Sequence, residues 1–180
     1  MNLTLVHWYV IRASGILLLL LYSGATVLGL MNVSRIASPQ WPRFVIDRVH
    51  RYVALLALVF LAIHILSTVT DSFVATPLVA VIIPFAKSYN TFWVGLGAAA
   101  SDLMLAITIT SIMRARVGAR TWRAIHYAVY AAWPLAVLHG MGAGTDASSF
   151  WLIALNILCI LAVFGALAVR MIAVPRLETV

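Results

Sequence analysis

Four long stretches without a charged side chain constrain this sequence more than any other feature. An α-helix needs about 20 apolar residues to cross the hydrocarbon core of a bilayer. The uncharged stretches cover 13–34, 52–70, 124–145 and 147–169, and each comes close to that length. A fifth stretch, about 91–113, is interrupted only by Asp102. Only 9% of the residues are charged, against about 25% in soluble domains. The sequence therefore predicts a polytopic membrane protein.

One further apolar run, 72–86, is not expected to cross the bilayer. It is shorter than the other stretches and contains Pro77 and Pro84, so a spanning helix is unfavourable there. We predict a re-entrant or interfacial segment near 72–90. The predicted fold is all-α, an integral membrane bundle of five transmembrane helices in a single transmembrane domain, 1–180. The predicted helices are about 9–31, 48–70, 91–113, 122–142 and 149–172.

The distribution of basic residues favours this topology. If 72–86 does not cross, ten of the twelve lysines and arginines fall on one side, and only Arg12 and Lys87 on the other. The positive-inside rule then predicts that the N-terminus is outside and the C-terminus inside. The net charge of +7 thus reflects topology and contact with membrane lipid, and we expect no nucleic-acid partner.

Four of the five histidines form a regular pattern. His50 and His64 make a His-x13-His motif on the second predicted helix, and His126 and His139 make a His-x12-His motif on the fourth. Both helices are predicted to run from inside to outside, so His50 lies at the depth of His126, and His64 at that of His139. Within each helix the two histidines are about 20 Å apart along the axis. Two stacked pairs of facing imidazoles are the ligand set of two six-coordinate haems.

An alternative interpretation remains open for these histidines. Thirteen helical steps leave a side chain about 140° from its starting face, and a kink at Pro134 would have to correct part of this twist. Without haem, the histidines would form a proton relay in a structural or proton-conducting subunit of a larger membrane complex. His7, at the outer end of the first helix, is predicted to be a packing or proton-path residue.

The histidine spacing resembles that of the ferric reductase-like transmembrane domain, which NADPH oxidases, ferric reductases and the haem subunit of bacterial methionine sulfoxide reductase share. Four stretches are similar to the bacterial branch: Ile11-Arg12-Ala13-Ser14, Trp93-Val94-Gly95-Leu96-Gly97, Trp122-Arg123-Ala124-Ile125-His126 and Leu138-His139-Gly140. The resemblance covers nearly all of residues 8–170. It implies two b-type haems, an inner one on His50 and His126 and an outer one on His64 and His139.

The resemblance also implies a function. We expect a di-haem b-type cytochrome, the haem subunit of an oxidoreductase in a bacterial cytoplasmic membrane. It would carry electrons from a flavoprotein or other reductase on the inner side to an outer-side acceptor. The family's FAD/NADPH domain and the first of the oxidases' six helices are missing, so flavin is expected only on a partner. The alternative is a quinol-linked haem subunit for a periplasmic reductase, with a quinone as cofactor and a periplasmic or membrane protein as partner.

Three arginines are candidates for the haem propionates. Arg12 precedes the apolar run of the first helix, where it would bind an outer propionate or act as a snorkelling anchor. Arg51 and Arg123 flank the inner histidines. They are expected to bind inner propionates or to serve only as topology determinants that attract anionic lipid.

Two further residues have both a functional and a structural interpretation. Trp133 falls between the two histidines of its helix. It is interpreted either as an aromatic residue between the haems or as a core residue. Asp102 lies in the middle of the third predicted helix. It is a candidate proton-transfer or quinone-site residue, or it bonds Ser101, Thr108 or a neighbouring helix.

Overall fold

The computed structural model describes residues 3–34, 38–72 and 76–177. Across these ranges the chain is helical and contains no strand. The helices are α1 (Leu3–Val33), α2 (Arg43–Thr70), α3 (Leu78–Ile82), α4 (Thr91–Ile112), α5 (Arg114–Val117), α6 (Ala119–His126), α7 (Val129–Gly142) and α8 (Phe150–Leu177).

Four of these helices are long and apolar enough to cross a membrane: α1, α2, α4 and α8. Their outward surfaces carry large apolar side chains such as Leu66, Ile109 and Phe164, each more than half exposed. In water such a surface would be unfavourable, whereas in a bilayer it contacts lipid tails. The predicted class, an all-α integral membrane bundle, is confirmed.

The fourth predicted span, 122–142, consists of two shorter helices. α6 ends at His126 and α7 begins at Val129. At the break, the amides of Ala128 and Tyr130 bond the carbonyls three residues earlier, which is the tighter 3₁₀ pattern. Pro134, inside α7, has no N–H to donate to the carbonyl four residues before it. The helix therefore changes its winding between the two histidines.

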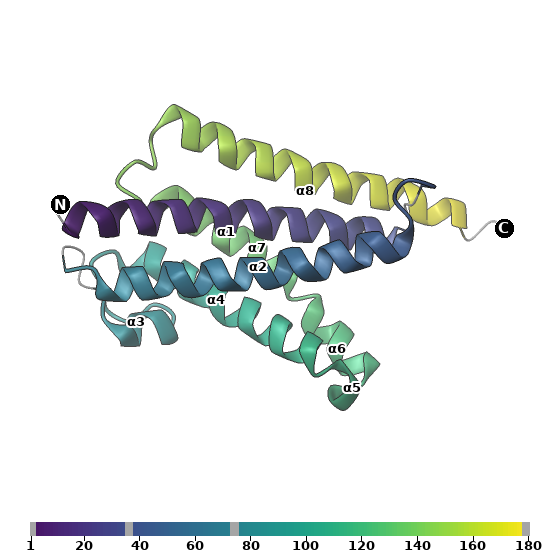
Figure 1. Ribbon diagram of the computed structural model, residues 1–180, viewed down its shortest axis with the longest axis horizontal. Helices are drawn as coiled ribbons and strands as arrows, with labels where there is room; N and C mark the ends of the chain where they lie inside the picture. Colours follow the sequence, from purple (N-terminus) through teal and green to yellow (C-terminus); the bar gives the residue numbers. More distant parts are fainter. Residues whose placement is uncertain (1–2, 35–37, 73–75, 178–180) are drawn as a thin grey trace.

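The connection between α2 and α4 does not cross the bundle. α3 packs against α4, at the end of the bundle where α2 ends (Figure 1). Pro77 is the N-cap of α3, and Pro84 follows its end, so prolines bound this helix on both sides. The first turns of α1 and the last turns of α8 lie at opposite ends (Figure 1), as an odd number of crossings requires.

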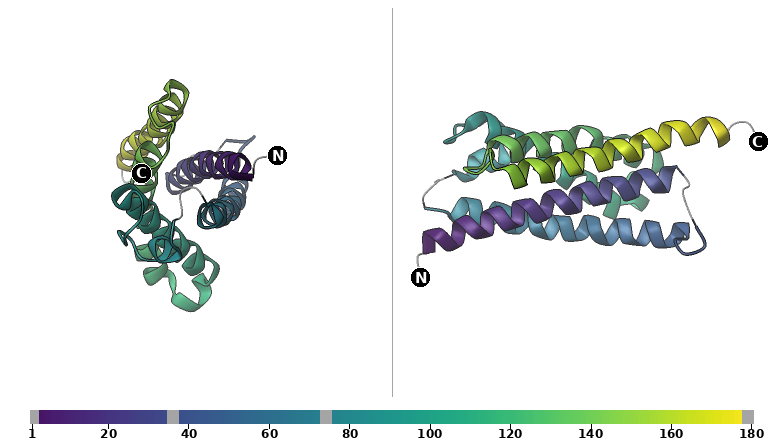
Figure 2. Two further views of the ribbon diagram at one scale, coloured as in Figure 1. Left: turned by 90° about the vertical axis from the view of Figure 1, so that its left-hand side faces the viewer. Right: turned by 90° about the horizontal axis from the view of Figure 1, so that it is seen from above.

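The helices pack as two pairs. α1 packs along α2, α4 packs along α7, and α8 covers α1 (Figure 2). A buried cluster joins α1, α4, α7 and α8 near mid-height and consists of Leu19, Tyr22, Ile107, Ala132, Trp133, Val137, Cys159 and Val163. A second, smaller cluster of Ala57, Leu61 and Met104 joins α2 to α4. Two cavities lie between the pair α1/α2 and the helices α4, α6 and α7.

Candidate cofactor site

The structure brings the four patterned histidines together as two facing pairs. The rings of His50, from α2, and His126, from α6, have centres 6.3 Å apart. Those of His64, from α2, and His139, from α7, have centres 6.2 Å apart. Two imidazoles that bond one metal ion at about 2 Å each need ring centres roughly 6 Å apart. Both pairs therefore have the spacing of axial ligands on a shared iron.

Backbone carbonyls fix the orientation of three of the four rings. A carbonyl oxygen only accepts hydrogen bonds, so each bonded Nδ1 carries the proton and leaves Nε2 as the free ligand nitrogen. In each case the carbonyl belongs to a neighbouring helix. The Nδ1–oxygen pairs are His50 with Ala25 (2.9 Å), His64 with Ile11 (3.0 Å) and His139 with Trp93 (2.8 Å).

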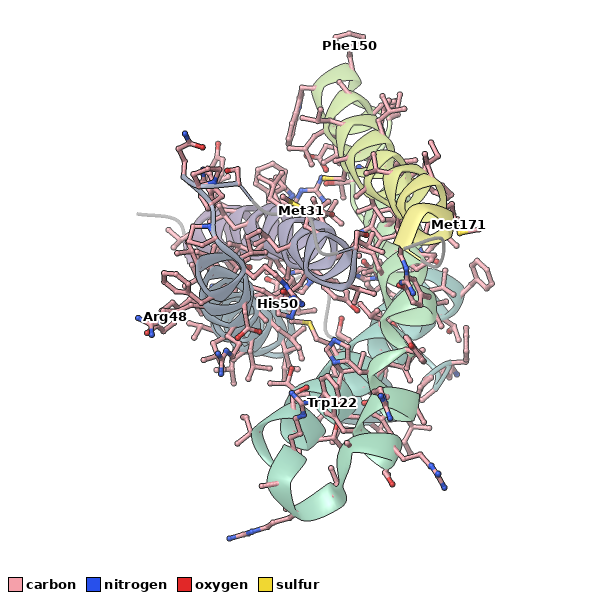
Figure 3. All side chains as sticks on the ribbon, turned by 90° about the vertical axis from the view of Figure 1, so that its right-hand side faces the viewer. Met31, Arg48, His50, Trp122, Phe150 and Met171 are labelled. Atoms are coloured by element: carbon pink, nitrogen blue, oxygen red, sulfur yellow. The ribbon has the colours of Figure 1, made fainter. Side chains whose placement is uncertain are left out.

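His126 is oriented by a hydroxyl instead. Its Nδ1 lies 3.5 Å from the Oγ of Ser111, at the outer limit of hydrogen bonding. Ser111 also accepts a bond from Nε1 of Trp122 at 3.1 Å, and the guanidinium of Arg114 lies 4.0 Å from the centre of the Trp122 ring system. In Figure 3, His50 lies on the side of α1 and α2, and Trp122 lies opposite it on the side of α5 and α6. Because only the short helix α5 and the residues at its two ends separate α4 from α6, the chain folds back and Ser111 is held beside His126.

Each histidine pair lines its own cavity. The His64 cavity, beside His64 and His139, holds about 1320 Å³ of empty space, and the His50 cavity, beside His50 and His126, about 1380 Å³, open mouths included. Their walls are mainly apolar side chains, as is usual for cofactor sites. This arrangement suits a large, flat, apolar group with a metal at its centre.

Glycines let the backbone approach the histidine rings. A Cβ at Gly97 would lie 2.6 Å from Nδ1 of His139, and a Cβ at Gly15 would lie 3.1 Å from Cε1 of His64. At Gly29 the corresponding distance, to Cε1 of His50, is 3.4 Å, an ordinary contact. The rings, the orienting carbonyls and the close glycines thus form two sites of the same kind, each with two imidazoles facing each other across a cavity.

Arg12 lies on the wall of the His64 cavity. Its guanidinium is paired with Asp146, which precedes α8, and lies 5.9 Å from the ring centre of Trp8. Nε of Arg12 is buried without a hydrogen-bond partner. Tyr89 lines the same cavity and donates a bond to the carbonyl of Ala143 at 2.9 Å. Burial raises the pKa of the Tyr89 phenol, and the Arg12 guanidinium opposes the rise.

The structure separates the two arginines predicted beside the other histidine pair. Arg51 lines the His50 cavity and is paired with Asp47, whereas Arg123 lines neither cavity. Arg170, near the end of α8, takes this second position and donates a hydrogen bond to the hydroxyl of Tyr130. Arg170 lies far along the chain from His50 and His126. Nothing in the sequence around it therefore indicates that it lines their cavity.

Trp133 does not lie between the cavities. Its Nε1 donates to Oγ of Ser23 at 2.9 Å, its ring packs against Phe164, and it lines neither cavity. Two residues that the sequence did not single out, Tyr22 and Met104, line both cavities. Each is 6% exposed. The two residues that line both cavities therefore come from α1 and α4.

Asp102 and His7 also lie outside both cavities. Asp102 is exposed on the surface of α4. The two hydroxyls predicted to bond it donate elsewhere, Ser101 to the carbonyl of Ala98 and Thr108 to that of Met104. Asp102 is thus placed away from the histidines.

The fold and these cavities define a helical integral membrane protein with two facing pairs of imidazoles in its interior. Residues 11–137, more than half of the chain, match the family described as ferric reductase like transmembrane component, and the chain belongs to this family. It is therefore a transmembrane electron-transfer component of a family that generally binds haem. His50, His64 and His126 lie within the match, and His139 lies just beyond its end. No curated protein and no solved structure matched the chain.

Proposed function

We propose that this chain is a di-haem b-type cytochrome that carries electrons across the membrane. His50 and His126 would ligate one iron, and His64 and His139 the other. The observation that carries the proposal is the ring spacing of 6.3 and 6.2 Å in the two pairs. When bound, haem supplies the one-electron redox chemistry.

The chain itself supplies ligands, orientation and a dry surrounding. The carbonyls on Nδ1 of His50, His64 and His139 hold the tautomer that ligates a metal and raise its basicity. Apolar walls keep water away from the cavities and lower the local dielectric. Tyr22 and Met104, on the walls of both cavities, supply the medium through which an electron would pass between the sites.

The two ends of the molecule suggest different partners. Most arginines lie at the His50 end, beside α2 and α5–α6, so the positive-inside rule assigns this end to the cytoplasm. We propose that a flavoprotein or other reductase on another chain delivers electrons there. They would leave from the His64 cavity to an acceptor on the outer side of a bacterial cytoplasmic membrane, with the N-terminus outside and the C-terminus inside.

Haem content tests the proposal directly. Protein purified in detergent should give a dithionite-reduced b-type spectrum, with close to two haems per chain by the pyridine haemochrome assay. Circular dichroism of the same sample reports whether the helices are folded. A helical, monodisperse preparation that holds no haem after expression with excess haem would contradict it.

Arg12 should tune the potential of the haem in the His64 cavity. A cation stabilises the ferrous form relative to the ferric form, more strongly at low dielectric. Arg12→Leu is expected to lower that midpoint potential by roughly 60 mV, about a tenfold change in a one-electron equilibrium. Asp146→Asn should shift it upward, because Asp146 partly neutralises Arg12. A spectroelectrochemical titration measures both.

Lys87→Leu is the matched control for this pair. Lys87 is exposed at the same end of the bundle and does not line the cavity, so both potentials should stay unchanged. Shifts of the same sign in Arg12→Leu and Asp146→Asn would show that disturbed packing, not charge, moves the potential.

A further inference from the structure

Asp102 is a carboxylate in the middle of a membrane-spanning helix, and it faces outward. α4 runs from Thr91 to Ile112, so Asp102 lies about 15 Å from either end. Its side chain is exposed and lines neither cavity. Acidic residues within membrane spans almost always face a bundle interior or a polar cavity, because lipid solvates them poorly. The position of Asp102 is therefore unfavourable for the chain alone.

No other part of the described chain compensates this carboxylate. Across residues 3–34, 38–72 and 76–177, nothing hydrogen-bonds or ion-pairs with Asp102. The hydroxyls nearest in sequence, Ser101 and Thr108, bond backbone carbonyls of their own helix. Asp102 therefore has no compensating group among the described residues, and a partner from outside the chain can supply one.

The surface around Asp102 is shaped for another helix. Ala99 and Ala106 lie three residues before and four residues after it, on the same side of α4, and Ile109 follows at the next step; Asp102, Ala106 and Ile109 are exposed and Ala99 is partly exposed. We call these four residues the Asp102 face. Small residues in such a row let a second transmembrane helix approach closely, and a polar side chain then bonds across the contact.

We propose that the Asp102 face docks a transmembrane helix of a different protein, one that carries a basic or amide side chain near the middle of the bilayer. A second copy of this chain fits less well. Copies related by rotation about the membrane normal place equal residues at equal depth. At that depth the described spans hold no lysine or arginine. A second copy would thus oppose Asp102 with another carboxylate, whereas a basic or amide group is complementary.

A model peptide can stand for the partner helix. The purified protein, labelled at its C-terminus, is reconstituted in phosphatidylcholine vesicles with a labelled leucine–alanine transmembrane peptide that has one central lysine. Energy transfer is expected to indicate binding about three- to thirtyfold tighter than that of the same peptide with a central leucine, the range measured for polar contacts between membrane helices. In Asp102→Leu this preference should disappear. Asp102→Asn and the wild type should bind a peptide with a central glutamine equally tightly.

Asp47→Leu is the control, because Asp47 is an acidic residue at the start of α2 and should leave the lysine preference unchanged. Equal binding of the lysine and leucine peptides by the wild type would overturn the proposal, as would a lysine preference that survives in Asp102→Leu. Energy transfer between two labelled copies that depends on Asp102 would identify a homodimer surface instead, and would also overturn it. The docking inference does not rest on the proposed haem function, and the absorption spectrum of each variant reports the cofactor separately.

Discussion

His64→Ala is expected to remove one haem from the protein and to leave the other in place. The stoichiometry should fall from close to two haems per chain to close to one. His64 and His139 face each other across one cavity, whereas His50 and His126 face each other across another. Losing an axial ligand therefore affects one site. Haemochrome assays and low-temperature reduced spectra of the purified variant measure the effect.

His50→Ala should give the complementary result. The residual spectrum of His50→Ala and that of His64→Ala should add up to the wild-type spectrum, because each variant keeps a different site. His7→Ala is the matched control, since His7 lies on α1 and lines neither cavity. Identical residual spectra in the two ligand variants would contradict the pairing, and so would loss of both haems from a folded protein.

The depth of each histidine could be predicted from the sequence, and its partner could be as well. Helical rise is constant, so two motifs of nearly equal length, on helices that run in the same direction, match His50 with His126 and His64 with His139. The direction followed from the prolines in 72–86 and from the arginine distribution. Helical rise and the number of membrane crossings both add up residue by residue along the chain. The depth of a residue and the direction of its helix can therefore be worked out from the sequence alone.

The direction in which a side chain points was less accessible. An ideal helix turns His139 away from the face of His126, so the sequence predicts a corrective kink at Pro134. In the structure the winding changes earlier, at the 3₁₀-type bonds between α6 and α7. A break of this kind depends on how α6 packs against α4, so it cannot be read from the residues of one helix.

Contacts between distant segments were the least accessible. Trp133 has the right depth to lie between the cavities, yet its hydrogen bond to Ser23 turns it toward α1 and α8. Tyr22 and Met104 take the position instead, and their sequence surroundings are ordinary apolar spans. The rotation of a helix about its own axis depends on the packing of all its neighbours together. The helix that carries Trp133 is apolar on every face, so its sequence does not show which way Trp133 points.

Gly97→Ala is expected to empty the His64 cavity selectively. The added Cβ would lie 2.6 Å from Nδ1 and 2.7 Å from Cε1 of His139. The ring cannot retreat easily, because the same Nδ1 bonds the carbonyl of Trp93 at 2.8 Å. Overpacking of this kind costs about 1–3 kcal/mol, which corresponds to roughly five- to 150-fold weaker retention of the haem on this ligand.

Other glycines of the same protein provide a graded comparison. In Gly24→Ala the new methyl group meets no atom within 4 Å, so this variant should keep both haems and gain helix stability, as alanine usually provides. Gly15→Ala, with a contact of 3.1 Å to the ring of His64, should weaken the same site less than Gly97→Ala does. Gly29→Ala, at 3.4 Å from the ring of His50, should be tolerated. Haem dissociation to apomyoglobin ranks the four variants. If Gly97→Ala lost haem no faster than Gly24→Ala, the close approach of α4 to His139 would have no part in holding the cofactor.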